Sequence, residues 1–186
     1  MAPSTKLALA NALKKQLQKR FLDDITVKAL VEDCEVNRQT FYYHFQDIYD
    51  LLRWFLAHET EEALRDAADW REALLRAFYY VRDNHLVIYH IYRSDGREQM
   101  ENQLRSLARA MVEENLAAVA GELDLEQGDR LFLSDFYMYA VSGVLVGWLS
   151  GEMREEPEQV VDRLVRLLDG EFRQAAEKFA RPEPAV

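Results

Sequence analysis

Residues 38–45, RQTFYYHF, carry the side chains of this sequence that are best suited to chemistry with nucleic acid. Arginine can bond guanine through two hydrogen bonds, glutamine can do so with adenine, and threonine or tyrosine can contact the methyl group of thymine. Arg38, Gln39, Thr40 and Tyr43 could therefore read bases from one face of a helix that enters the major groove. The same letters could also be an ordinary mixture of core and surface residues.

The aromatic run within this stretch, Phe41 to Phe45, divides into two faces when it is placed on a helix. Phe41 and Phe45 are four residues apart and share one face, so we expect them to form the core beneath the recognition helix. Tyr42 and His44 carry polar groups that suit phosphate oxygens. Contacts of that kind position a protein on DNA but carry little sequence information.

The neighbouring sequence predicts the helices that position these side chains. Thr26 is a good cap for a short helix that ends near Cys34, and Asn37 is a good cap for a helix from 38 to 45. Glu35-Val36-Asn37 leaves room only for a tight turn. Two short helices joined by such a turn form a helix-turn-helix, whose second helix meets base edges with its N-terminal residues.

The rest of the chain also favours helix, and we expect an all-α fold. Proline and glycine are scarce, and no segment shows sustained alternation of apolar and polar residues. The remaining expected helices cover about 5–20, 48–65, 70–83, 85–92, 97–120, 129–150 and 157–180. Their expected starts are Ser4 or Thr5, Asp47, Asp69 with Glu72, Asp129 and Pro157.

The charge of the chain is unevenly distributed. The formal net charge is -10, from 23 Lys and Arg against 33 Asp and Glu. Residues 1–60 contain 8 basic and 8 acidic side chains, which leaves 15 basic and 25 acidic for the remainder. Because the remainder is acidic, residues 1–60 are the only credible surface for nucleic acid.

The segment ITVKALVEDCEVNRQTFYYHFQDIYDLLRWF, residues 25–55, resembles the DNA-binding domain of the TetR family of bacterial regulators. The family's run of Thr-aromatic-Tyr-x-His-aromatic corresponds to residues 40–45. The stretches NRQTFYYHFQDIYDLL and FYMYAVSGVLVGWLSGEMREEPEQV are similar to a subgroup of dihydroxyacetone-kinase regulators. The resemblance implies a three-helix DNA-binding domain at 1–47, a connecting helix at 48–65, and a helical ligand-binding and dimerisation domain at 66–186.

The resemblance also assigns roles to residues. It implies base-facing Arg38, Gln39, Thr40 and Tyr43, phosphate-facing Tyr42 and His44, and a contact from Thr26 to phosphate through its hydroxyl or backbone N–H.

Two positions depart from the family pattern. Glu35 stands where the turn usually has glycine, which costs about 1 kcal/mol if the residue adopts a positive φ. Ile48 stands where a phosphate-binding lysine is common, so we expect a weaker salt dependence of DNA binding.

Aromatic side chains are frequent in the C-terminal half, and most of them fit a core. A few could line a ligand cavity, because such sites are mostly apolar with a few polar groups. The candidates are Tyr89, Tyr92, Phe132, Asp135, Phe136 and Tyr139. Asp135 either meets a ligand donor or favours the first turns of its helix. His85 and His90 do not share a helical face, so we expect no metal site and no cofactor.

Gly143 and Gly147 are four residues apart, a spacing that lets another helix approach closely. That helix could belong to the same subunit or to a second one. In TetR-like proteins the last two helices form the dimer interface. The resemblance therefore implies a homodimer with Gly143, Gly147, Leu164 and Leu168 in its interface, and a pseudo-palindromic operator.

These features together predict a cytoplasmic regulator that binds double-stranded DNA, most simply a repressor controlled by a small-molecule effector. The single cysteine, Cys34, fits a reducing compartment, and no N-terminal signal pattern precedes the first helix. The apolar run 131–149 contains Asp135 and several polar residues, which indicates a buried helix and no membrane span. The alternative is a coactivator with the same fold that works through a protein partner. No enzyme motif supports catalysis.

Overall fold

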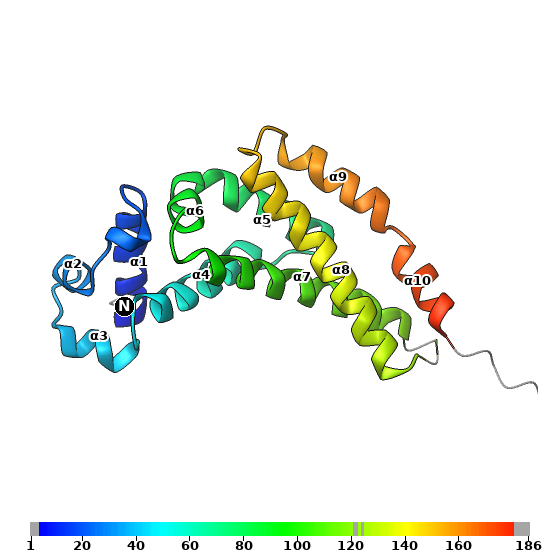
Figure 1. The fold of residues 1–186 in the computed structure, drawn as a ribbon, viewed down its shortest axis with the longest axis horizontal. Coiled ribbons are helices and arrows are strands. Elements are labelled where there is room, and N and C mark those ends of the chain that lie inside the picture. Colours follow the sequence, from blue (N-terminus) through cyan, green and yellow to red (C-terminus); the bar gives the residue numbers. More distant parts are fainter. Residues whose placement is uncertain (1–3, 121–122, 124, 181–186) are drawn as a thin grey trace, which may run out of the picture. The chain divides into compact units, whose positions relative to one another are not determined.

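The structure, a computed structural model, describes residues 4–120, 123 and 125–180 (Figure 1). Every regular element in these ranges is a helix, so the expected all-α fold is confirmed. The chain divides into two compact units. The first comprises Met1–Asp66 with Tyr79–Gln103, and the second comprises Ala67–Phe78 with Leu104–Val186. The functional limits expected at 47 and 65 remain a prediction, because this division reports packing alone.

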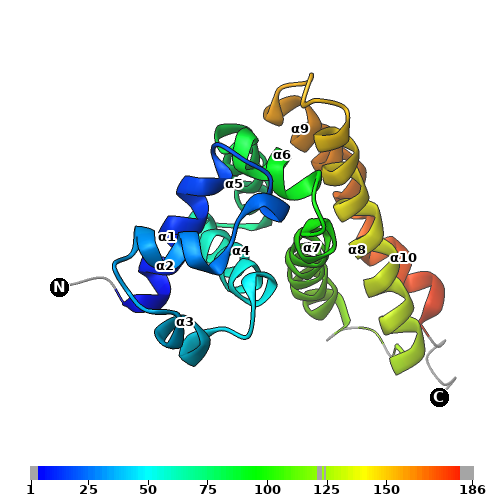
Figure 2. The same cartoon turned by 60° about the vertical axis from the view of Figure 1, so that its left-hand side comes forward.

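The first unit contains the predicted helix-turn-helix. Its complete helices are α1 (Thr5–Leu17), the short 3-10 helix η1 (Leu22–Asp24), α2 (Val27–Asp33), α3 (Arg38–His44), α4 (Ile48–Leu64) and α6 (His85–Tyr92). Figure 2 shows α1, α2 and α3 gathered beside the beginning of α4. The helices α5 (Trp70–Asp83) and α7 (Arg97–Ala120) contribute residues to both units.

Leucines at helical spacing form the centre of the first unit. Leu9, Leu13 and Leu17 recur every four residues along α1 and are fully buried. Helix α1 packs against α2 and α4, whose own fully buried leucines include Leu30 and Leu51. Burial of each such side chain contributes roughly 1.5–3 kcal/mol, so α1 and α4 together form the support that carries α2 and α3.

The second unit is built around α8 (Gln127–Ser150), with α9 (Pro157–Leu168) and α10 (Glu171–Phe179) after it. The ring of Tyr137 on α8 lies 4.7 Å from that of Phe172 on α10. On α5, the ring of Phe78 lies 4.9 Å from that of Trp148 on α8. These aromatic contacts fix one side of α8 within the unit.

Two predicted helix limits in this unit are wrong. The final helix was expected to run unbroken from 157 to 180, but Gly170 adopts a φ of 77° and divides it into α9 and α10. The left-handed conformation is accessible to glycine at no steric cost. Asp129 was expected to cap α8, whereas α8 begins two residues earlier after Glu126 and has Asp129 in its first turn.

Helix α8 is long and apolar enough to cross a membrane by length and composition, and no other helix in the described ranges is. The core helix of a protein without any membrane span meets the same test. Within α8, 44% of the most apolar window is buried inside the protein. This property alone therefore does not indicate a membrane protein.

Candidate nucleic-acid interface

Side-chain caps set the beginnings of the two short helices. The Thr26 hydroxyl accepts a hydrogen bond from the backbone N–H of Ala29 at 3.2 Å, and the side-chain Oδ1 of Asn37 accepts one from the backbone N–H of Thr40 at 2.8 Å. Each bond satisfies an N–H group that has no partner within its own helix. Between the helices Glu35 adopts a φ of 55°, which is the left-handed conformation that a glycine would tolerate better.

One face of α3 is closed against the rest of the unit. Phe41 and Phe45 are 0% and 3% exposed, with ring centroids 5.9 Å apart. Phe45 also meets the ring of Trp54 on α4 at 6.1 Å, which ties the end of the recognition helix to the connecting helix. Aromatic contacts of this kind are worth about 0.5–1.5 kcal/mol beyond the area they bury. The orientation of α3 is therefore set by its aromatic face.

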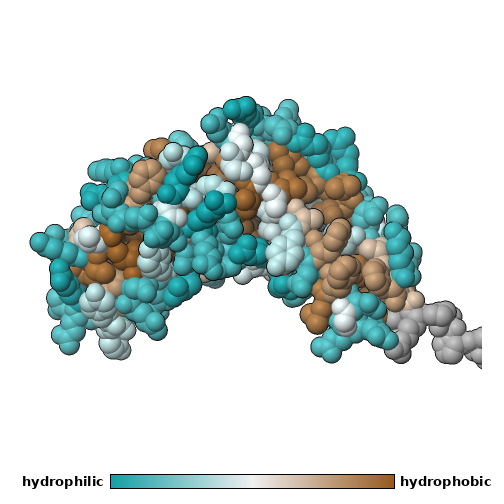
Figure 3. Space-filling view, viewed as in Figure 1, coloured by the Kyte–Doolittle hydropathy of each residue, from teal (hydrophilic) through white to brown (hydrophobic). Residues whose placement is uncertain are grey.

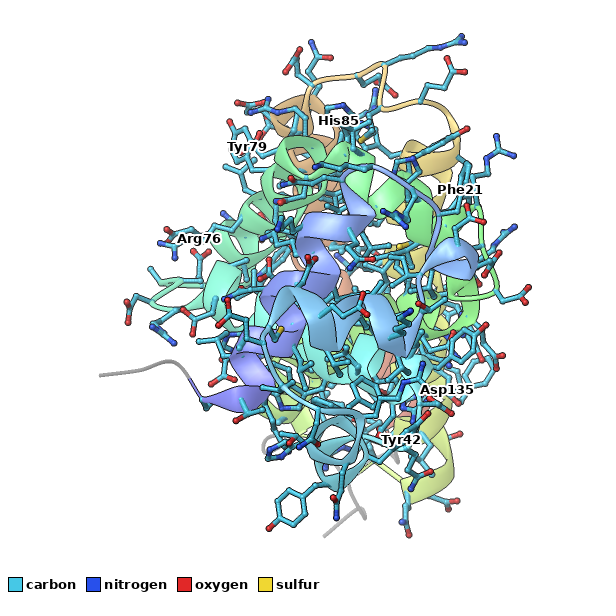
Figure 4. All side chains as sticks on the ribbon, turned by 90° about the vertical axis from the view of Figure 1, so that its left-hand side faces the viewer. Phe21, Tyr42, Arg76, Tyr79, His85 and Asp135 are labelled. Atoms are coloured by element: carbon cyan, nitrogen blue, oxygen red, sulfur yellow. The ribbon has the colours of Figure 1, made fainter. Side chains whose placement is uncertain are left out.

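The opposite face of α3 is open. Arg38, Gln39, Tyr42 and Tyr43 are all exposed, and Tyr43 is 84% exposed. Figure 4 shows Tyr42 at the surface of this helix. Exposed tyrosine rings of this size are unusual without a partner, because they leave apolar area in water. The face thus combines a guanidinium and a carboxamide with two aromatic hydroxyls.

Thr40 and His44 are half-buried. The Thr40 hydroxyl donates to the Asn37 carbonyl oxygen at 3.1 Å, so it reinforces the cap of α3. The His44 ring meets that of Tyr43 edge-on at 5.0 Å. Thr26, at the start of α2, is exposed.

The beginning of α4 has two carboxylates, Asp47 and Asp50, around Ile48, the position where the family commonly has a lysine. Ile48 is half-buried, and Asp47 caps the helix by accepting from the N–H of Asp50 at 2.7 Å. Asp50 in turn accepts from the N–H of Gln46 and pairs with Arg53 at 3.0 Å. Carboxylates stabilise a helix N-terminus, but they repel phosphate. The first turn of α4 therefore presents carboxylates, and the nearby Arg53 is paired with Asp50.

Lys6 is a further candidate for contact with DNA that the sequence alone does not indicate. Its ammonium lies 5.6 Å from the centre of the Phe45 ring, so α1 brings a cation to the end of the recognition helix. Cation–π contacts at partly exposed sites contribute about 0.5–1 kcal/mol. Nothing in the local spacing around Lys6 or Phe45 indicates the contact, because the two lie on different helices.

A polar cluster behind this surface joins three helices of the first unit. Glu59 of α4 forms an ion pair with Lys14 of α1 and accepts a hydrogen bond from the hydroxyl of Tyr80 on α5 at 2.6 Å. Burial raises the pKa of Tyr80 well above its usual range, and the hydrogen bond to Glu59 raises it further. Hydrogen bonds to a charged group contribute about 1.5–3 kcal/mol, so the cluster holds α1 against α4.

The six residues considered for a ligand cavity fall into both units. In the first, Tyr89 is exposed beside Phe21, and Tyr92 is half-buried under the guanidinium of Arg97. In the second, Phe132, Phe136 and Tyr139 lie on the open side of α8 and are each about 60% exposed. Asp135 pairs with Arg109 of α7 at 2.6 Å. Whether these residues take part in a ligand site stays a prediction.

The four residues expected in a dimer interface differ in their exposure to solvent. Gly143 and Gly147 are exposed on the same open side of α8, and a Cβ at either position would have no atom within 4 Å to meet. Leu164 and Leu168 are buried within the second unit. The exposed apolar residue between them on α9 is Leu167. Residues 4–120, 123 and 125–180 contain no cluster of three or more His, Cys, Asp or Glu that could hold a metal.

Comparisons with known proteins agree with this geometry. A TetR family model described as "Transcriptional regulator C-terminal region" matches residues 68–170. Over 94 residues, the chain is 29% identical to the HTH-type dhaKLM operon transcriptional activator DhaS of Lactococcus lactis subsp. lactis (strain IL1403). This match covers 49% of the chain and spans about half the length of the relative, 50%.

Three solved structures share the fold across nearly the whole chain. The dihydroxyacetone kinase operon activator DhaS superposes with a TM-score of 0.68 at 18% identity, covering 96% of this chain and 99% of that one. The TetR family repressor AlkX of Dietzia sp. strain DQ12-45-1b gives 0.53 at 16% identity, with coverages of 92% and 96%. RolR without ligand gives 0.53 at 15% identity, with coverages of 97% and 99%. At these identities the likeness shows the fold alone.

Proposed function

Because the chain belongs to the TetR family of transcriptional regulators, we propose that it binds a pseudo-palindromic DNA operator as a homodimer and that a small molecule controls this binding. The observation that carries the proposal is the open face of α3. Arg38 and Gln39 are exposed in its first turn, where a recognition helix meets base edges. Phe41 and Phe45 keep that turn in place from behind.

Base and phosphate contacts divide along this face in the proposal. Arg38, Gln39, Thr40 and Tyr43 read bases, whereas Thr26, Tyr42 and His44 bond phosphates. The chemistry of the side chains supports this division. Guanidinium and carboxamide groups match base edges, and threonine or tyrosine can contact the thymine methyl group. Hydroxyl and imidazole groups can also bond phosphate oxygens. Thr40 contributes its methyl group, because its hydroxyl is bonded to Asn37.

The direction of regulation is a separate matter from operator binding. A repressor was the simplest expectation, and AlkX is described as a repressor, but the relative from Lactococcus is described as an activator. A dimer that covers a promoter blocks it, whereas one bound upstream can assist polymerase. We propose operator binding as the act common to both, and transcription in vitro from a template with the operator assigns the direction.

The proposal places the effector in the C-terminal region, residues 66–186, and the protein in the cytoplasm. A screen of metabolites by thermal shift should find compounds that raise the melting temperature, because a ligand that binds only the folded state stabilises it by mass action. An effector must also change the affinity for operator DNA by several-fold or more. A compound that stabilises the protein without this second effect is not the effector.

Selection of bound duplexes from a random pool tests operator binding. We expect enrichment of one motif with two inverted half-sites, whose spacing reflects the distance between the two recognition helices. If no motif is enriched at any salt concentration, direct DNA reading is excluded. That result would favour the coactivator alternative, which the neutral charge of residues 1–60 and the acidic start of α4 leave open.

A further inference from the structure

A hollow beside η1 and α6 carries exposed groups that the proposed contact with DNA does not use. Its volume is about 460 Å³, within the range of about 300–1,000 Å³ that is usual for small-molecule sites. Its lining consists of two aromatic rings, two carboxylates and one guanidinium, from Phe21, Asp23, Asp24, Tyr89 and Arg93. All five residues belong to the first unit.

Two exposed rings form the apolar wall of this hollow. The ring centroids of Phe21 and Tyr89 lie 6.0 Å apart, with 47° between the ring planes. In the space-filling view the first unit is mostly hydrophilic, whereas hydrophobic surface gathers over α8 in the second unit (Figure 3). Among the described residues of the first unit, the other exposed aromatic side chains are Tyr42 and Tyr43 on α3. A pair of exposed rings on a polar surface marks a place where a ligand can bury apolar area.

Contacts within the first unit hold the walls of the hollow in place. The ring of His90 meets that of Phe21 nearly edge-on, with centroids 4.8 Å apart. The Nδ1 of His90 donates a hydrogen bond to the backbone carbonyl of Leu17, at the end of α1. The carboxylate of Asp23 accepts a hydrogen bond from the backbone N–H of Asp95 at 3.1 Å. A site that is formed before the ligand arrives loses less conformational freedom on binding.

Opposite charges line the hollow without pairing with each other. The guanidinium of Arg93 lies over the Tyr89 ring, 5.7 Å from its centre. Within the described part of the chain, none of the ion pairs includes Asp23, Asp24 or Arg93. More than 4.0 Å therefore separates each of these carboxylates from the guanidinium. The hollow thus offers both signs of charge to a ligand, next to two rings.

We propose that this hollow binds a free α-amino acid with a large apolar side chain. The ammonium group of the amino acid meets Asp23 and Asp24, its carboxylate meets Arg93, and its side chain packs against the two rings. Hydrogen bonds between charged groups are roughly twice as strong as neutral ones, and an arginine can bond a carboxylate through two parallel N–H groups. One ligand therefore pairs all three charged groups.

Simpler ligands satisfy only part of this lining. An organic cation would pair with Asp23 and Asp24 but would be repelled by Arg93, and an anion would meet the reverse problem. A neutral apolar molecule would leave all three charged groups without a partner. The site combines residues of the expected DNA-binding domain with residues at α6, so it is distinct from an effector site confined to residues 66–186.

NMR titration of the isotope-labelled full chain with L-phenylalanine tests the site. We expect the backbone resonances of residues 21–24 and 89–93 to shift. Because ion pairs between exposed groups are individually weak, the dissociation constant should be on the order of 1 mM. Glycine, which lacks the apolar side chain, should bind about 5-fold more weakly or worse. N-acetyl-L-phenylalanine and L-phenylalaninamide should do the same, because each lacks one of the two charges.

Variants of the hollow test its location. Asp24→Asn and Arg93→Gln should each weaken the binding of phenylalanine about 5-fold or more, since each removes a charge that the ligand pairs with. Asp162→Asn and Arg130→Gln make the same changes at exposed positions of the second unit and should leave binding unchanged. All four variants replace exposed side chains, so each should keep the wild-type melting temperature in the absence of ligand.

Three results would overturn the proposal. The first is the absence of any shift at about 10 mM phenylalanine, a concentration well above the expected dissociation constant. The second is equal binding by the wild type, Asp24→Asn and Arg93→Gln, which would place the ligand elsewhere. The third is binding of the acetylated derivative as tightly as phenylalanine. Operator binding is measured without amino acid, so failure of this site leaves the proposed function unaffected.

Discussion

At the scale of single residues, the side chains of α3 and of Phe45 just after it divide by exposure into a buried and an exposed group. Phe41 and Phe45 are buried, whereas Arg38, Gln39, Tyr42 and Tyr43 reach solvent. The periodicity of the sequence predicts this division, because residues four apart share a face of a helix. The half-burial of Thr40 could not be predicted so easily, since it depends on the hydroxyl turning toward Asn37.

Replacement of Arg38 by alanine should relax the base preference at one position in each half-site. The expected loss of discrimination is about 1–3 kcal/mol at that base pair, the value of a bidentate contact. Selection from a random pool with the variant measures it. Tyr42→Phe is the matched control, because losing a phosphate contact should weaken all sites about equally. An unchanged motif with Arg38→Ala would mean that α3 enters the groove in another orientation.

Tyr80 should make stability sensitive to high pH. Its pKa is raised in the folded state, first by burial and then by the bond to Glu59. The folded state therefore gains its full stabilisation from the neutral ring below the unfolded pKa of about 10. This stabilisation is lost as the pH rises from that value through the higher pKa of the folded state. Urea unfolding should show a steeper fall in the free energy of unfolding above pH 10 in the wild type than in Tyr80→Phe.

At neutral pH, Tyr80→Phe should lower the free energy of unfolding by about 1.5–3 kcal/mol, because a hydrogen bond to a charged group is lost. Tyr42→Phe serves as control here too, since Tyr42 is exposed. Equal alkaline sensitivity in wild type and Tyr80→Phe would show that another group controls this range.

At the scale of elements, features that depend on residues close together in the sequence could be predicted, and features that depend on tertiary packing could not. The caps Ser4, Thr26, Asn37 and Asp47 were predicted and are confirmed, because each acts within its own first turn. The break at Gly170 was missed because the apolar spacing continues through it from Leu168 to Phe172. The open side of α8 was missed because exposed and buried aromatics look alike in a sequence.

The turn between α2 and α3 carries measurable strain. Glu35 has a φ of 55°, a conformation that costs a residue other than glycine roughly 1–2 kcal/mol. Glu35→Gly should therefore raise the free energy of unfolding by up to about 1 kcal/mol, after allowance for the greater freedom of glycine in the unfolded chain. Glu35→Ala keeps the strain and should give no gain. A gain of equal size in both variants would assign the effect to the lost charge.

At the scale of the whole molecule, the negative charge lies in residues 61–186, so the surface of residues 1–60, which has no net charge, is the one on which we expect DNA to bind. Residues 1–60 have no net charge, and the start of α4 presents Asp47 and Asp50 to the solvent near α3. Few counterions are released when such a surface meets DNA. In the proposed complex with DNA, base contacts and neutral hydroxyls therefore have to supply an unusually large share of the binding free energy.

The salt dependence of operator binding should accordingly be weak. We expect the slope of log K against log salt to be clearly shallower than the value of about -10 seen for strongly basic regulators. Fluorescence anisotropy from 50 to 300 mM salt measures it. Ile48→Lys is an informative variant, because a restored phosphate contact at this half-buried position should steepen the slope by about one unit. A wild-type slope near -10 would contradict this reading of the surface.

Equilibrium binding to the selected operator tests the central claim most directly. The titration uses the full chain at one fixed salt concentration with three duplexes: the complete site, a single half-site and a scrambled sequence. We predict that the complete site binds at least about 10³-fold more tightly than the scrambled duplex, with most of that preference lost when one half-site is removed. Equal affinity for all three duplexes would contradict the account of a dimer that reads DNA through α3.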